Sequence, residues 1–197
     1  MIINVLGCDP ALSNFGLAQA QIDTDTGEIK PLRLDLAETA PSKNKKVRKN
    51  NDDLERCRKL TEALRKNSNG ASVCFVEMPV GSQSARAMAS YGACMGILSG
   101  SPLPLIQLTP KEVKEAAVGN PNASKEEMIA WAYEKYPDLN WIKGDSRSKN
   151  PGNLANKNEH LADAIATLHA GVNHEDFRSV VSILRMTQSG GFGEFAH

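Results

Sequence analysis

The sequence predicts an α/β domain with a central five-stranded mixed sheet, in which three antiparallel strands are followed by two parallel ones and helices flank the sheet. Two observations lead to this fold class. Residues 1–39 contain three strand-like segments separated by turn residues, which indicates an antiparallel meander. Further along, two short apolar runs alternate with amphipathic helical segments, and this order favours parallel pairing of the later strands.

The first three strands are short and separated by clear turn signals. The apolar run 2–8 is the first strand, and the turn residues after Asp9 lead into a second strand at about 15–22. Residues 23–27 are rich in Asp, Thr and Gly and predict a turn. The third strand, at about 29–39, alternates leucines with charged residues, as a half-buried strand should.

A helix is expected at about 52–67, then a strand at 72–77 and a second helix at about 83–99. Each helix carries an apolar stripe at helical spacing. The second helix also carries a stripe of small residues, against which another backbone can come close, either the sheet or a partner subunit. The apolar stripes are Leu54, Cys57, Leu60 and Leu64 in the first helix and Met88, Tyr91, Met95 and Leu98 in the second, and the small stripe is Ala85, Ala89, Gly92 and Gly96.

The fifth strand is expected at about 103–108. Capping boxes that begin at Thr109 and Ser124 predict two short helices, which end near Gly119 and near position 136.

Residues 137–157 are rich in Pro, Gly, Asn and Ser and predict a long loop, which in a compact domain is usually functional or mobile. Helices follow at 159–172 and 175–186. We therefore expect a single domain over residues 1–186 and a flexible Gly-rich tail over 187–197.

Composition limits the possible functions. The chain has 197 residues, with 23 Lys plus Arg and 23 Asp plus Glu, so overall charge gives no argument for nucleic acid and only local clusters can. The four cysteines form no close pair, which favours a reducing cytosol. The N-terminus carries no signal-peptide pattern and no long apolar stretch, so no membrane association is expected.

Three separate segments carry residues suited to one metal site. Asp9 and Glu77 each end an apolar strand, and His160 and Asp163 lie three apart on the polar side of a helix. Carboxylates brought together repel unless a cation sits between them. Each residue also has a structural explanation: turn chemistry for Asp9, a salt bridge to Arg86 or a lysine for Glu77, an exposed surface position for His160, and a favourable helix dipole for Asp163.

Four segments resemble the motifs of RuvC-type Holliday-junction resolvases, within the RNase H-like (retroviral-integrase-like) nuclease superfamily. They are the hairpin 7–16, the strand end at 75–77 with the helix that follows it, the segment 109–125, and the helix motif His-Leu-Ala-Asp-Ala at 160–164. Their order and spacing agree with the family from residue 2 to about 172. The chain resembles a phage-borne or divergent member of that family.

The resemblance implies an RNase H-like fold and a divalent-metal-dependent endodeoxyribonuclease. Such an enzyme resolves Holliday (four-way) junctions and related branched DNA, and leaves 5′-phosphate and 3′-hydroxyl ends. It would use two Mg²⁺ ions per active site, with Mn²⁺ as a substitute. By position, the metal ligands would be Asp9, Glu77, His160 and Asp163, the basic catalytic residues Lys114 and Lys125, and Glu159 would support the ligands from behind.

Several basic residues are expected to contact DNA phosphates, although lysine runs are also commonly solvated loops. The near two-fold symmetry of a four-way junction favours a homodimer, and no nucleotide cofactor is expected. The expected place of action is the cytoplasm of a bacterial or phage-infected cell. The predicted DNA contacts are Lys43, Lys45, Lys46, Arg48, Lys49, Lys114, Lys125, Arg147 and Lys149, with Lys143 near the last two.

Three departures from the family are visible. Ala11 stands where relatives have glycine, and Val80 stands near the position of an aromatic that opens the junction. The basic segment 43–49 and the loop 143–157 are longer than usual.

Two alternatives remain open, and a third lacks the features that it requires. A related nuclease would cut flaps or RNA–DNA hybrids, and a junction-binding module would lack catalysis, although no acid of the site is missing. An actin-like or sugar-kinase-like ATPase opens with a similar hairpin, but it needs a second phosphate loop and a longer chain.

Overall fold

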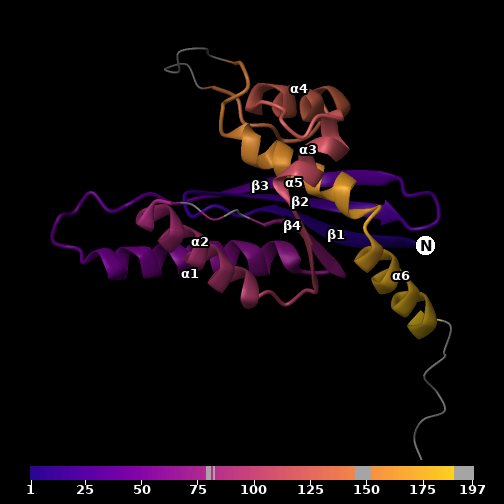
Figure 1. Ribbon diagram of the computed structural model, residues 1–197, viewed down its shortest axis with the longest axis horizontal. Helices are drawn as coiled ribbons and strands as arrows, with labels where there is room; N and C mark the ends of the chain where they lie inside the picture. The colour runs from indigo at the N-terminus through magenta and orange to yellow at the C-terminus, as the bar shows by residue number, and fades with distance from the viewer. Residues whose placement is uncertain (79–80, 82, 145–151, 189–197) are drawn as a thin grey trace, which may run out of the picture.

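The sheet has the predicted mixed topology. The computed structural model describes residues 1–78, 81, 83–144 and 152–188. Its five strands lie in the order β3-β2-β1-β4-β5 (Figure 1). Strands β1 to β3 pair antiparallel, whereas β4 pairs parallel with β1 and with β5. The strands are β1 (Ile2–Asp9), β2 (Asn14–Asp23), β3 (Ile29–Glu38), β4 (Val73–Glu77) and β5 (Leu105–Leu108).

The helices follow in the predicted order. Thr109 and Ser124 form capping boxes that start α3 and α4, and Gly119 ends α3 in a left-handed conformation. The last helix runs to Gln188, two residues beyond its predicted end. The helices are α1 (Lys49–Ser68), α2 (Ala85–Ser99), α3 (Pro110–Val118), α4 (Lys125–Lys135), α5 (Asn158–Gly171) and α6 (Glu175–Gln188).

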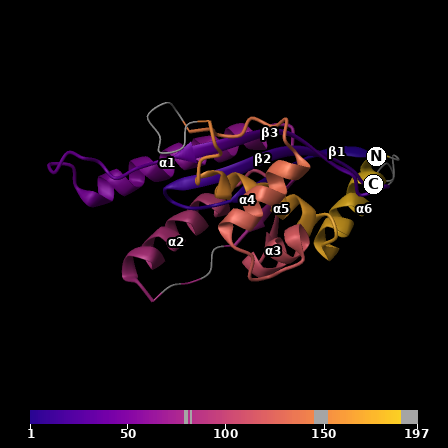
Figure 2. The same ribbon diagram turned by 90° about the horizontal axis from the view of Figure 1, so that it is seen from above.

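The sheet separates two apolar layers (Figures 1 and 2). On one face, Leu60 and Leu64 of α1 and Cys94 of α2 pack on side chains of β1, β2 and β4. On the other face, α5 crosses β1 and β2, with α3, α4 and α6 around it. Alternation of side chains along each strand supplies both layers, because successive residues point to opposite faces.

Helix α5 lies very close to the sheet because glycine stands beneath it. A Cβ at Gly16 would lie 1.9 Å from the carbonyl oxygen of His160, and one at Gly7 would lie 2.1 Å from the carbonyl oxygen of Ala164. Ala162 and Ala166 are fully buried at the same contact. These small residues bring the first turn of α5 next to the end of β1.

The base of the long loop before α5 is held by a buried asparagine. Asn158 is fully buried, accepts a hydrogen bond from Ile142 N and donates to the carbonyl oxygens of Ile142 and Ala155. Asn140 pairs in the same way with the backbone of Leu34 at the edge strand β3. The described parts of the loop therefore set where α5 begins.

Two predicted apolar stripes are only partly correct. Leu54 is 51% exposed and Met88 is 41% exposed, whereas Arg56 on α1 is 4% exposed. The helical spacing placed Leu54 toward the sheet, but in the fold this side chain is exposed and Arg56 is buried instead. The buried position is filled by the guanidinium of Arg56, which finds hydrogen-bond acceptors in the β1–β2 turn.

The small-residue face of α2 points outward. Ala85, Ala89, Gly92 and Gly96 are exposed, and a Cβ added at either glycine would meet no heavy atom within 4 Å in the part of the chain that the structure describes. Packing of this face on the molecule's own sheet, one of the two alternatives drawn from the sequence, is therefore wrong.

None of the described helices combines the length and the apolar character that crossing a membrane requires. The four cysteines, Cys8, Cys57, Cys74 and Cys94, are free thiols.

Candidate active site

The predicted acidic residues come from three elements that meet at one end of the sheet. Asp9 is the last residue of β1 and Glu77 the last of the parallel neighbour β4. Helix α5 brings His160 and Asp163 to the same place. Carboxyl ends of adjacent parallel strands lie side by side, which is why acids 68 positions apart can act on each other.

Asp9 and His160 are in direct contact. The Nδ1 atom of His160 lies 2.6 Å from Oδ2 of Asp9, and the two side chains are 16% and 15% exposed. Burial lowers the pKa of His160, but its hydrogen bond to Asp9 and the charges of Asp9 and Glu159 more than offset this, so the pKa is raised. Direct metal binding by the Nδ1 atom of His160 would require this hydrogen bond to open.

Glu77 and Asp163 are acids whose ionisation is unfavourable where they stand. Burial, followed by the charges of Asp9 and Asp163, raises the pKa of Glu77 to about 8. Burial, followed by the charge of Asp9, raises the pKa of Asp163 to about 7. Neither carboxylate has a hydrogen bond or an ion pair with any described residue, and Arg86, the partner considered for Glu77, pairs with Asp53 instead.

Two lysines lie at the rim of this cluster, and they differ in whether they form an ion pair with a described residue. Lys114 is close enough to lower the pKa values of both Glu77 and Asp163 without forming an ion pair with a described residue. Lys125 is 70% exposed, and its Nζ atom lies 2.6 Å from Oε1 of Glu159. The same Glu159 oxygen lies 3.6 Å from Nε2 of His160, so Glu159 contacts a predicted ligand rather than the centre of the cluster.

A cavity of about 430 Å³ opens beside the cluster. One wall is the β1–β2 turn, residues 10–14, and the other is formed by Ala87, Ser90, Tyr91 and Cys94 of α2. His160 lies at its edge. Two other cavities, of about 550 and 490 Å³, lie beside α6 and between α3 and α5, and the predicted ligands do not line them.

The donor set fits a hard divalent cation. Mg²⁺ and Mn²⁺ prefer carboxylate oxygens as ligands, and these carboxylates are half-buried, and the charge of Asp9 raises the pKa values of both Glu77 and Asp163. Among the described residues, no three His, Cys, Asp or Glu side chains already stand close enough to enclose an ion.

The predicted DNA-contacting residues are distributed over separate places. Residues 41–49, here named the basic arm, join β3 to α1 and project from the end of the sheet at which β1 and β4 finish (Figure 1). All five basic side chains of the arm are exposed and pair with no acid in the described chain. Arg147 and Lys149 lie outside the described residues.

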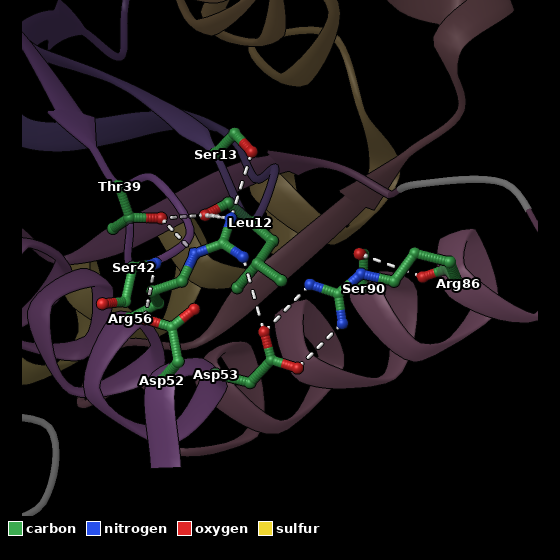
Figure 3. Close-up of polar contacts among 9 residues, drawn as sticks. All are labelled: Leu12, Ser13, Thr39, Ser42, Asp52, Asp53, Arg56, Arg86 and Ser90. Atoms are coloured by element: carbon green, nitrogen blue, oxygen red, sulfur yellow. Dashed lines mark hydrogen bonds and ion pairs between the residues drawn. The ribbon is translucent and has the colours of Figure 1, made fainter. Parts of the chain in front are cut away.

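The sequence analysis did not predict one charged group near the site. Arg56, Asp53 and Arg86 form a charged chain from α1 to α2 behind the β1–β2 turn (Figure 3). Helical periodicity placed an apolar residue inward there, and the only available signal was the Asp53–Arg56 spacing of three, which is common on exposed helix faces.

Known proteins share both sequence and fold with this chain. It is 30% identical over 132 residues to the crossover junction endodeoxyribonuclease RuvC of Salinibacter ruber, which covers 63% of this chain and 67% of the relative. No family model matches the chain.

Two solved structures share the fold. Thermus thermophilus RuvC in complex with a Holliday junction substrate aligns with a TM-score of 0.58 and 20% identity over 85% of this chain and 92% of that one. The fowlpox virus resolvase in complex with Holliday junction DNA aligns with a TM-score of 0.54 and 16% identity over 86% of this chain and 97% of that one. The RNase H-like fold predicted from the sequence is confirmed. Identity to a curated relative across two thirds of its length shows that this chain belongs to the RuvC family of crossover junction endodeoxyribonucleases.

Proposed function

We propose that this protein is a structure-selective DNA endonuclease that resolves four-way junctions and related branched DNA by phosphodiester hydrolysis. The observation that supports it most is the meeting of Asp9, Glu77 and Asp163, three half-buried acids from distant segments, where Lys114 and His160 offset their charge only in part. Membership of the RuvC family agrees with this activity. The products would carry 5′-phosphate and 3′-hydroxyl ends.

We infer that the site takes two divalent ions, Mg²⁺ or Mn²⁺, held by Asp9, Glu77 and Asp163 with His160 as a further ligand. Bound ions of this kind activate a water and stabilise the leaving oxygen of the phosphodiester. His160 contributes before that by holding one oxygen of Asp9, which orients the carboxylate at the end of β1. Glu159 in turn lies beside His160 and Lys125.

The lysines at the rim have separate roles in this proposal. Lys114 offsets the negative charge of Glu77 and Asp163, and it can meet the phosphate that is cut. Lys125 becomes available to DNA only when it exchanges Glu159 for a phosphate oxygen. The exposed basic side chains of the arm would bind phosphates of the DNA and so release the counterions condensed on it, and we propose that Arg147 and Lys149 also contact phosphates.

We infer a homodimer in which the outward small-residue face of α2 meets its copy. The face lacks side-chain bulk at Gly92 and Gly96 and is exposed in the single chain, so two helices can approach closely there. A two-fold pair would place one active site on each half of a four-way junction. Free thiols suit a reducing compartment, and we propose the cytoplasm of a bacterial or phage-infected cell.

The test uses a fluorescently labelled four-way DNA junction with Mg²⁺ and compares wild type with Asp9→Asn and Glu77→Gln. Cleavage should fall on the order of 10²–10³-fold or more, while binding measured in Ca²⁺ persists. The matched control is Glu55→Gln, an exposed acid on α1, which should cleave normally. Unchanged cleavage in either site variant would rule out the proposed centre. A panel of junctions, flaps and RNA–DNA hybrids defines the preferred substrate.

A further inference from the structure

A buried arginine lies behind the turn that follows Asp9. Arg56 on α1 is 4% exposed, and every part of its guanidinium has a partner (Figure 3). Burying a charge is costly unless it is paired and hydrogen-bonded, so the residues around Arg56 must supply acceptors for its guanidinium. An apolar side chain would fill the same space in a helix packed on a sheet.

The first set of partners belongs to the β1–β2 turn. The Nη2 atom of Arg56 donates to the carbonyl oxygen of Leu12 at 3.3 Å and to Oγ of Ser13 at 3.1 Å. Its Nε atom donates to Oγ1 of Thr39 at 3.0 Å, and that hydroxyl donates to the same Leu12 carbonyl oxygen. Arg56 thus fixes the turn three and four positions beyond Asp9.

The second set of partners leads to α2. The Nη1 atom of Arg56 lies 3.4 Å from Oδ1 of Asp53, one turn earlier in α1. Asp53 also accepts a two-pronged contact from Arg86 at 2.8 and 2.9 Å. Because Arg86 is the second residue of α2, one carboxylate ties the start of that helix to Arg56.

These two ends are the two walls of the cavity beside the candidate active site. Leu12 and Ser13 belong to one wall, and Ala87 and Ser90 of α2, adjoining Arg86, belong to the other. Ser90 also donates to the carbonyl oxygen of Arg86, one turn earlier in the helix (Figure 3). The chain Arg56–Asp53–Arg86 joins the walls and sets their separation.

The contacts around Arg56 also extend to the basic arm. Thr39, which accepts a hydrogen bond from Arg56, is the residue after β3. The backbone N–H of Ser42 donates to Oδ1 of Asp52 at 3.0 Å, and Asp52 directly precedes Asp53 in α1. The β3 end of the arm is therefore attached to the part of α1 that holds the turn, and its other end continues directly into α1. A phosphate gripped by the arm would be held at a defined distance from Asp9.

We propose that Arg56 and Arg86 are positioning residues for the substrate: through Asp53 they set the width of the groove between the β1–β2 turn and α2. This rests on the proposed nuclease function and deepens it. Arg86 governs one wall, so its loss should loosen DNA in the groove. Arg56 governs the turn that carries Asp9 as well, so its loss should also misplace the reacting groups.

The experiment measures kcat and KM for Mg²⁺-dependent cleavage of a labelled four-way junction, at a temperature well below the melting point of every variant. Arg86→Gln should raise KM about tenfold and leave kcat within about threefold. Arg56→Gln should raise KM and also lower kcat by about 10–100-fold, since small misplacements are costly. Arg56→Lys should recover only part of the lost activity, because an ammonium group cannot reproduce the planar set of donors of the guanidinium.

The control is Arg58→Gln, two residues along α1, whose exposed side chain pairs with Glu55 at 3.8 Å. It should match wild type within about twofold. The double variant Arg56→Gln/Arg86→Gln should lose less than the product of the single losses, because both act through Asp53.

Wild-type kcat and KM in both single variants, with only a lower melting temperature, would show that the chain is a structural brace and overturn the proposal. A fall in kcat at constant KM in Arg86→Gln would overturn it too. If Arg56→Gln does not fold, Asp53→Asn and Arg86→Gln carry the same test. Failure of wild type to cleave any branched DNA, or normal cleavage by Asp9→Asn, would instead refute the nuclease function itself.

Discussion

Two polar clusters flank the β1–β2 turn, and they differ in how their charges are compensated. Behind the turn, Arg56, Asp53 and Arg86 form a chain in which every charge has an opposite partner. In front of it, Glu77 and Asp163 are half-buried beside Asp9, and burial, followed by the charge of Asp9, raises the pKa values of both. In the first cluster each charged group already contacts an opposite charge within the fold. The second cluster would need additional positive charge to balance its acids.

The difference separates structural from functional polarity. An ionic chain whose groups already contact opposite charges acts through the elements that it joins. A buried set of acids with few cations lowers the stability of the fold, and such a set persists where it binds something. In the second cluster Lys114 lowers the pKa values of Glu77 and Asp163, and His160 lowers that of Asp163, but both pKa values stay above the ordinary range.

The largest expected effect is opposite stability changes in the two clusters. Arg56→Met should lower the free energy of unfolding by about 2–3 kcal/mol, because it deprives buried turn atoms of a charged donor. Glu77→Gln should raise it at about pH 8, because the amide cannot become a buried anion. Urea unfolding in EDTA measures both. Destabilisation by Glu77→Gln would contradict the contrast, and Arg58→Met serves as the surface control.

The next effect is a dependence of stability on pH. The pKa of Glu77 rises from 4.5 to about 8, so the folded protein holds a proton that the unfolded chain has released. The free energy of unfolding in EDTA should therefore fall as pH rises from about 4.5 to about 8. Melting temperatures at both ends of this window test it.

Added Mg²⁺ or Mn²⁺ should reverse that loss at the alkaline end, because ions bind the deprotonated acids of the folded state. Glu77→Gln should flatten the dependence. A melting temperature that climbs steadily with pH in EDTA would contradict the assigned environment. Charge loss in the other cluster, through Arg86→Gln, should leave this slope unchanged.

The smallest effect concerns the salt bridge at the rim. Glu159→Gln should free Lys125 for a DNA phosphate, raise junction affinity about threefold and steepen the salt dependence of binding by about one unit. Anisotropy titrations in Ca²⁺ over a range of salt check this. The matched variant Lys125→Gln should do the opposite, and equal behaviour of the two variants would exclude competition between carboxylate and phosphate.

Local patterns were enough for the elements and for the candidate acids. Alternation in β3, the capping boxes at Thr109 and Ser124 and the strand ends at Asp9 and Glu77 are all properties of short stretches of chain. The outward face of α2 and the buried Arg56 were not visible in this way. Both depend on which segments lie next to each other after folding.

The sequence alone determined the order of strands and helices, the three segments that supply the acids, and the family, because hydrophobic period, caps and motif order act over a few residues. Tertiary structure alone decided the charge state of the site. Whether Glu77 is costly or Asp53 is compensated depends on neighbours brought from distant segments and on the water they exclude. The Coulomb energy between buried groups follows distance in space, which spacing along the chain does not record.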